Sequence, residues 1–345
     1  MRHPDRSAPR AGRRPTPTAV AAIAASLVAA VATPAGAQQM VNELEASVRL
    51  GFELETEPET SIAFQDFGSR IRWNGEKAIS DDLVGLGYLE FGFDDGDRIV
   101  EGVQVDGGIS ATRYAYIGVA APFGTVTGGK QYRAFYDAVT SVVDVAYVGS
   151  CLYELSCSRQ SGVIKYERAL GEQLRLVAST TLVDGDVDDD FVDEIEAGAI
   201  VDLGGINVGA GLTIGNDGGE TALRTSEDTG VALGVAASTE LREDLTVSAT
   251  LQFASDDYLG GPDDGFGVTV AGVADRFYGL VSVADAENTP FYATLGYEYP
   301  IDDDALIYAE VQGVETDEPG EDFEVFLRSV FVYNFGSVSG ISRER

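Results

Sequence analysis

The sequence contains a single histidine, His3, and it lies within the first 37 residues, which we expect to be removed on export. A mature chain without histidine excludes catalytic sites that depend on this residue, namely Ser-His-Asp and Cys-His nucleophile systems. It also excludes zinc sites with histidine ligands. Together with the strand pattern described below, this absence leads us to expect a protein that is not an enzyme.

Positive charge is also scarce. The chain has 23 Lys and Arg residues against 57 Asp and Glu, a formal net charge of −34 at pH 7. Proteins bind a phosphate backbone through basic patches, so this balance argues against nucleic acid as a partner.

Long apolar runs are absent after residue 37. The one run before it, 19–32, is shorter than the ~20 residues of a membrane-spanning helix, follows a basic segment and precedes the small residues Ala35 and Ala37. This pattern predicts a cleaved signal peptide over 1–37 and a mature start at Gln38. The mature chain is then exported without a spanning helix.

Cysteine is limited to Cys151 and Cys157. In an oxidising compartment, two cysteines at this spacing favour a disulfide. The alternative is a pair of free thiols.

Alternation of apolar and polar residues dominates the rest of the chain, beginning at 44–54. A period of two is typical of strands with one apolar and one wet face. Many of these segments approach the ~9–11 residues of a tilted membrane strand. We predict sixteen strands: 43–55, 61–74, 83–94, 110–121, 124–132, 160–168, 173–184, 192–203, 206–216, 228–240, 244–256, 265–273, 276–286, 290–299, 305–315 and 323–335.

The connections between these strands alternate in length. Short ones fall at 121–123, 203–205, 240–243 and 300–304, and longer, acidic, glycine-rich ones at 95–109, 133–159, 185–191, 217–227 and 257–264. Up-and-down membrane barrels have this asymmetry. We therefore predict an all-β fold, a transmembrane antiparallel barrel over 38–335 wide enough for an aqueous channel, followed by a C-terminal extension over 336–345.

Several segments, in order, resemble the general porins of Gram-negative outer membranes: 67–76, 87–91, 112–119, 123–130 and the aromatic ending 331–335. The resemblance implies a 16-stranded barrel in the outer membrane, surrounded by lipid and lipopolysaccharide. It also implies a homotrimer through which small hydrophilic solutes diffuse. The long third connection, 133–159, would fold inward and narrow the pore.

Matching motifs residue by residue gives candidate pore residues. The resemblance implies that Arg70, Arg113 and Arg159 form a basic side of the constriction. Asp144 matches the first acid of the inward loop, and Glu154 is a looser match for the second because the family's loop tip is replaced by 148–154.

Alternation supports and extends this set. Ile71 and Trp73 share one face of their strand, so Arg70 and Arg72 point into the lumen. We expect Tyr114 and Tyr116 to face lipid and Arg113 the lumen, since an arginine facing lipid costs about 2–4 kcal/mol at the midplane.

The same reasoning places three more charged residues inside: Glu90, Lys165 and Arg175. The alternative interpretation of all these charges is ion pairs at the rim or surface.

Acidic clusters recur in the connections, most densely at 184–190. This cluster lacks the glycine and glutamate of a calcium loop, so a solvated acidic loop is the simpler interpretation. Loosely bound Ca²⁺ at the acidic outer loops, or ions bridging to lipopolysaccharide phosphates, is the alternative. We expect no cofactor or resident metal, and a preference for cations at the pore mouths.

Three other functions compete with a passive porin. A barrel lipase or protease of the serine–histidine kind would lack its base. A soluble exported β-sandwich that binds other molecules would not explain the alternating connections. A solute-selective channel keeps the barrel and differs only in what the lumen binds.

Overall fold

The computed structural model describes residues 40–56, 60–94, 99–100, 103–104, 108–148, 155–182, 192–215, 230–255, 265–285, 291–315 and 323–336. Two predicted features fall outside these ranges: the signal-peptide cleavage site after residue 37, and the C-terminal extension over 336–345 except for its first residue.

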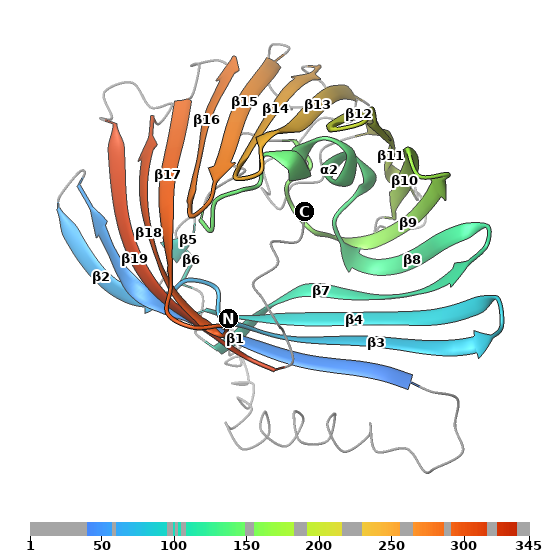
Figure 1. Cartoon of the computed structure of the whole chain (residues 1–345), viewed down its shortest axis with the longest axis horizontal. Helices are drawn as coiled ribbons and strands as arrows, with labels where there is room; N and C mark the ends of the chain where they lie inside the picture. Colours follow the sequence, from blue (N-terminus) through green and yellow to red (C-terminus); the bar gives the residue numbers. More distant parts are fainter. Residues whose placement is uncertain are drawn as a thin grey trace, which may run out of the picture. The chain divides into compact units, whose positions relative to one another are not determined.

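Nearly all described residues lie in strands (Figure 1). The first half of the barrel consists of β1 (Met40–Glu55), β2 (Ser61–Asp66), β3 (Arg70–Ser80), β4 (Leu83–Asp94), β7 (Gly108–Ala121), β8 (Gly124–Gln131), β9 (Gln160–Leu170) and β10 (Leu174–Leu182). The second half consists of β11 (Val192–Asp202), β12 (Ile206–Gly215), β13 (Gly230–Arg242), β14 (Leu245–Ala254), β15 (Gly265–Ala274), β16 (Phe277–Asp285), β17 (Phe291–Pro300), β18 (Ala305–Val314) and β19 (Glu324–Phe335). Two short strands, β5 (Ile99–Val100) and β6 (Val103–Gln104), pair only with each other.

The strands form one antiparallel sheet that closes because β1 pairs with both β19 and β2. The sheet contains 17 separate strand segments. Two of them, β2 and β3, are consecutive parts of one interrupted strand that both pair with β1, so the barrel wall has 16 strands. The predicted closed 16-stranded barrel is therefore confirmed. Closure pairs every strand on both sides, as a sheet in lipid requires.

The interruption lies at residues 67–69, where a side-chain turn replaces the ladder. One carboxylate oxygen of Asp66 accepts hydrogen bonds from the backbone N–H groups of Gly68 (2.7 Å) and Ser69 (2.6 Å). Gly68 has φ +87°, a conformation that favours glycine. Across the gap, the Arg49 N–H donates to the Ser69 hydroxyl at 2.8 Å, so the neighbouring strand keeps its partner.

Connection length alternates along the barrel as expected. Seven connections are short: 81–82, 122–123, 171–173, 203–205, 243–244, 275–276 and 301–304. The opposite rim carries the longer ones, of which 132–159 is the longest.

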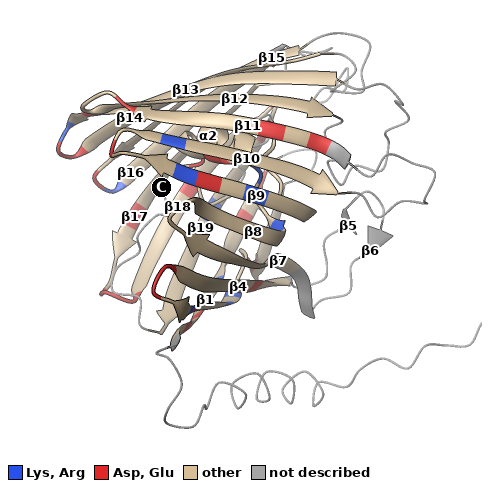
Figure 2. Cartoon of the chain, turned by 90° about the vertical axis from the view of Figure 1, so that its right-hand side faces the viewer, with Lys and Arg blue, Asp and Glu red and all other residues tan. Residues whose placement is uncertain are grey.

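Burial along the strands is the reverse of that in a soluble protein. The faces that alternate outward expose large apolar side chains, including Ile117 (74% exposed), Ile62 (70%) and Leu295 (62%). The opposite faces bury polar and charged side chains such as Glu90, Thr213 and Gln252. Figure 2 shows long uncharged stretches in most strands, interrupted by a few charged positions. An apolar exterior around a polar interior is the arrangement that a membrane barrel requires.

The segment after β8 packs on this polar inner face. It contains the short helix α2 (Ala134–Ala138) and a 3-10 turn η1 (Thr140–Val142). α2 contacts β10, β11 and β12, and Figure 1 shows it within the ring of strands. No helix in the described part of the chain is long and apolar enough to cross a membrane.

Candidate functional site: the barrel lumen

Glycines on the inner wall make room for α2. A Cβ atom added at Gly211 would lie 2.9 Å from the Phe135 ring, and one at Gly234 would lie 2.6 Å from it. A Cβ at Gly198 would lie 2.5 Å from the Cβ of Ala138. These distances are shorter than side-chain packing permits, so the helix can lie flat on the wall only because these positions are glycine.

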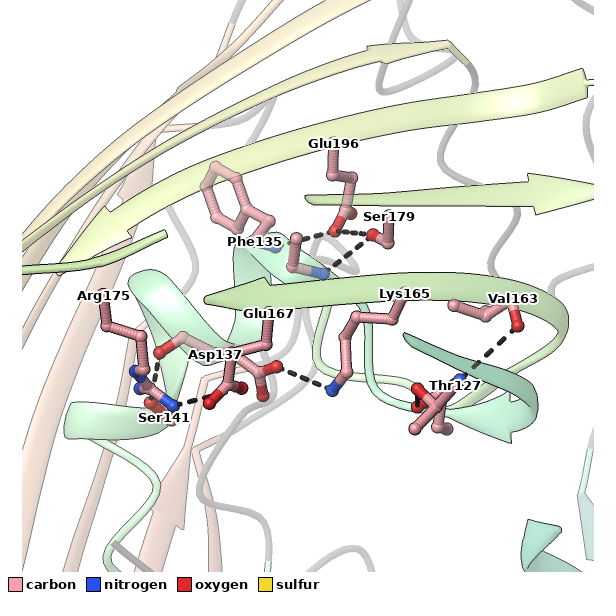
Figure 3. Close-up of polar contacts among 12 residues, drawn as sticks. Thr127, Phe135, Asp137, Ser141, Val163, Lys165, Glu167, Arg175, Ser179 and Glu196 are labelled. Atoms are coloured by element: carbon pink, nitrogen blue, oxygen red, sulfur yellow. Dashed lines mark hydrogen bonds and ion pairs between the residues drawn. The ribbon is translucent and has the colours of Figure 1, made fainter. Parts of the chain in front are cut away.

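A buried ionic cluster on β11 fixes both ends of the inward segment. Glu196 accepts the Phe135 N–H at 2.7 Å, near the start of the segment (Figure 3). It also accepts the Ser156 hydroxyl at 2.7 Å, near the end of the segment. Arg133 forms ion pairs with Glu194 and Glu196, and all three side chains are almost completely buried. Buried ions at such positions need partners, so the cluster constrains where the segment begins and ends.

The same segment reaches the opposite wall at Tyr147. The Tyr147 N–H donates to Glu310 at 2.8 Å, and its hydroxyl donates to Glu298 at 3.1 Å. Its ring stacks on Tyr308 at a centroid distance of 4.2 Å. The described part of the segment thus runs across the lumen from β11 to β18.

An arginine cluster surrounds Glu90 on the inner face of β4. The carboxylate lies 2.6 Å from Arg113 Nε, 3.2 Å from Arg72 Nη2 and 3.6 Å from Arg70 Nη1. The Glu90 side chain is only 1% exposed, whereas Arg72 and Arg113 retain partial exposure. Arg72 also lies 3.5 Å from the Glu45 carboxylate, so three cations face two anions and a net positive charge remains on this part of the wall.

A β-bulge explains how Arg113 points inward. Glu90 pairs with Tyr114 and Phe91 with Thr112, so Arg113 is the extra residue of β7. A bulge changes the alternation of faces. As a result, Tyr114 and Tyr116 also lie on the inner face, and the expectation that they face lipid was wrong.

Arg159 joins the aromatic residues beside this cluster. Its guanidinium lies 4.6 Å from the ring centroid of Tyr114 and 4.2 Å from that of Tyr132. Such cation–π contacts hold an arginine in place without neutralising it. Arg159 therefore lies next to, rather than within, the group formed by Arg70, Arg72 and Arg113.

The remaining predicted charges lie along β9 and β10. Lys165 Nζ is 2.7 Å from Asp137 of α2, and Arg175 Nη1 is 3.5 Å from Glu167 (Figure 3). Burial raises the pKa of Asp137, although Lys165 opposes this effect. Both ion pairs face the lumen, as alternation predicts for Lys165 and Arg175.

Asp144 lies beyond α2 and accepts a hydrogen bond from the Tyr136 hydroxyl at 2.6 Å. Burial, followed by the nearby Asp144 carboxylate, raises the pKa of Tyr136. Asp144 and Arg175 also line a cavity of about 320 Å³ beside Ser238 and Ser248. The inward segment therefore carries acid into the lumen.

Three predicted residues or groups lie outside the described residues: Glu154, Cys151 and the acidic cluster 184–190. The expected role of Glu154 and the pairing of Cys151 with Cys157 stay predictions.

The sequence reasoning missed Arg49, Arg133 and Arg328. Arg328 Nε lies 2.5 Å from Glu53, and Arg49 lies over the Tyr147 ring at 5.7 Å. Alternation could have found Arg49, which lies between Val48 and Leu50, but not Arg328, because Ser329 interrupts the apolar face and Val330 lies on the same face as Arg328. No sequence signal distinguishes Arg133, because it precedes a helix of only five residues.

A closed barrel with a polar lumen agrees with the comparison to protein families. The model of the Gram-negative porin family matches residues 19–322. The chain belongs to the Gram-negative porins. This porin is also similar to outer membrane protein U of Vibrio parahaemolyticus, with 29% identity over 214 residues. That alignment covers 57% of this chain and 63% of the relative.

Two solved structures support the fold at lower identity. Salmonella typhi OmpF, in a complex with daunomycin, superposes with a TM-score of 0.66 at 16% identity, covering 87% of this porin and 98% of OmpF. The trimer form of Vibrio cholerae OmpT gives a TM-score of 0.64 at 18% identity, covering 86% of this porin and all of OmpT.

Proposed function

We propose that this porin is a passive channel of the Gram-negative outer membrane, through which small hydrophilic solutes and ions diffuse. The observation that carries the proposal is the reversed burial of the barrel, which encloses charged and hydroxyl-bearing side chains behind an apolar exterior. Sixteen strands enclose more space than side chains fill, which leaves a path for water.

The constriction in this proposal has two sides. Arg70, Arg72 and Arg113 form the basic side, with Arg159 beside them, and the inward segment supplies Asp144 and Glu154 opposite. Glu90, Lys165 and Arg175 are further charges of the lumen. Opposed charges across a narrow pore create a transverse field that favours polar over apolar solutes.

The assembly and processing that accompany this function are further proposals. A homotrimer is supported by the trimer form of the related OmpT. A signal peptide over 1–37 and a Cys151–Cys157 disulfide both suit an exported protein. No described cysteine is free, which supports the disulfide. We propose no resident cofactor, and Ca²⁺ at acidic connections such as 184–190 would bind only loosely.

Planar-bilayer recording of the purified protein tests the function. We expect stepwise increases in conductance as single channels insert, and steps in groups of three from trimers. Absence of any ion current from a protein that migrates as a folded, heat-modifiable barrel would contradict the proposal.

A further inference from the structure

Five tyrosine rings form a continuous track on the inner wall. Tyr116 stacks on Tyr88 (centroids 5.5 Å apart, planes 16° apart), and Tyr88 meets Tyr114 edge-on at 5.4 Å. Tyr114 meets Tyr132 edge-on at 5.8 Å, and Tyr132 stacks on Tyr136 at 3.5 Å. Packing against each other and against Arg159 fixes these rings before any ligand arrives, which lowers the entropy cost of binding.

A cavity of about 270 Å³ lies beside this track, between strands β7 to β9 and α2. Aromatic side chains line one part of it, including Tyr114, Tyr116 and Tyr132. Apart from Leu86, polar groups line the rest: the hydroxyls of Thr125 and Thr127, the amide of Gln131, the carboxylates of Asp137 and Glu167, and the ammonium of Lys165. Pockets for drug-sized ligands occupy about 300–1,000 Å³, so this one suits a molecule with a single ring.

The charged groups of this cavity are already paired. Lys165 Nζ lies 2.7 Å from Asp137, and Arg175 lies 3.5 Å from Glu167 (Figure 3). An incoming cation or anion would have to compete with these ion pairs. A neutral ligand can instead hydrogen-bond to them, because a carboxylate that accepts from lysine or arginine still has lone pairs available.

From this combination we propose that the cavity is a binding subsite for a neutral sugar in its ring form. A pyranose ring presents C–H bonds on its faces, which suit tyrosine rings, and hydroxyls around its edge, which suit carboxylate, amide and threonine groups. This inference rests on the proposed function, since it makes the diffusion path one that retains such sugars briefly.

The chemistry also separates a ring from an open chain. Sorbitol carries similar hydroxyl groups but has no rigid face to lay against Tyr116, and ordering its chain costs more entropy. The site therefore favours glucose over sorbitol.

Ion current through purified channels tests the subsite, with glucose or sorbitol added at equal concentrations. We expect glucose to reduce the current saturably, and sorbitol to reduce it only in proportion to viscosity. Tyr116→Leu should weaken the apparent glucose affinity about tenfold, as loss of an aromatic contact predicts. Thr125→Val should weaken it less and serves as a second variant if Tyr116→Leu fails to fold.

Tyr297→Leu is the matched control. Tyr297 packs on Phe277 at 4.7 Å on the outer face, so its removal should leave glucose block unchanged. A glucose effect no larger than that of sorbitol, or equal block in Tyr116→Leu, would overturn the inference while leaving the channel intact. Block by the aromatic cation tyramine but not by glucose would overturn the ligand class. Absence of all current would instead refute the proposed function.

Discussion

Two parts of the barrel wall have outer faces of similar composition, but their inner faces carry different kinds of residue. From β12 to β15 the buried inner residues are small or uncharged, including Gly211, Ala236, Ser248 and Thr269. From β3 to β9 the inner residues include charged and aromatic ones: Arg70, Glu90, Arg113 and Lys165, together with the tyrosine track. Both parts expose large apolar side chains outward, such as Ile117 and Ile164 in the second part and Val235 and Leu251 in the first. Contact with lipid requires apolar residues on the outer face of every strand. The inner face is not constrained in this way, so one part of the wall holds the inward segment and the other lines the passage.

The largest effect should come from removing Arg133, the buried cation that holds the start of the inward segment against β11. Arg133→Met leaves Glu194 and Glu196 buried without their cation, and breaking a buried pair in this way costs about 3–5 kcal/mol. We expect a lower urea midpoint for unfolding in detergent, followed by the fluorescence of Trp73, the only tryptophan.

Arg242→Met controls for the loss of an arginine, because its pair with Asp244 is exposed. Surface pairs contribute about 0–1 kcal/mol. Equal midpoints for the two variants would contradict the role given to Arg133.

Filling the small-residue wall should have the next largest effect. Gly234→Ala places a methyl group 2.6 Å from the Phe135 ring, and overpacking of this kind costs about 1–3 kcal/mol. We expect faster protease cleavage within 133–159 and noisier channel currents. Gly128→Ala, where the added carbon meets nothing within 4 Å, should leave both unchanged.

A change in the charged wall should alter selectivity while leaving the fold intact. Arg113→Ala removes one cation from the cluster around Glu90. A unit charge at about 4 Å in water is worth about 1 kcal/mol, so the cation-to-anion permeability ratio should rise roughly twofold to fivefold. Reversal potentials in a salt gradient measure this ratio, and an unchanged or lowered ratio would show that the cluster does not face the ion path.

The smallest expected effect is on pH dependence. Because burial raises the pKa of Asp137, this residue takes up a proton at a pH above the ordinary aspartate value of about 3.9. Its protonation as the pH falls leaves Lys165 unopposed and shifts selectivity toward anions.

The raised pKa also means that the folded state holds this proton more tightly than the unfolded state. Its contribution to stability is therefore present at acid pH and is lost as the pH rises through the folded value. Reversal potentials recorded between pH 7 and pH 4 should show the shift toward anion selectivity in the wild type and not in Asp137→Asn. A shift of equal size in the variant would show that another group takes up the proton.

The sequence predicts the barrel well because lipid imposes a simple rule on every strand. Alternation at 44–54 and the short turns at 122–123 and 203–205 require no knowledge of distant contacts. The same rule directs Arg70, Arg72, Lys165 and Arg175 inward, on the faces that carry the ion pairs with Glu90, Asp137 and Glu167.

The rule fails where one residue changes the register. The bulge at Arg113 turns Tyr114 and Tyr116 inward, and nothing local distinguishes this segment from a regular strand. The interruption at 67–69 is equally hard to predict. Its turn depends on hydrogen bonds to the Asp66 side chain and on the Ser69 hydroxyl, which accepts the Arg49 N–H in place of a backbone carbonyl.

The contacts of the inward segment cannot be predicted from local sequence patterns. The pairing of Arg133 with Glu194 and Glu196 joins residues about sixty positions apart. The glycines under α2 become meaningful only once the helix lies on them. Long-range packing of this kind is what the structure adds to the sequence.

Thiol labelling of adjacent β9 positions tests the central arrangement most directly. In a Cys151→Ser, Cys157→Ser background, Lys165→Cys and Ile164→Cys differ only in the face of the strand that carries the thiol. A membrane-impermeant methanethiosulfonate added to channels in a bilayer should react with the cysteine at 165 and change the current, and should leave the one at 164 unmodified. Modification at 164 with protection at 165 would contradict a polar lumen inside an apolar exterior.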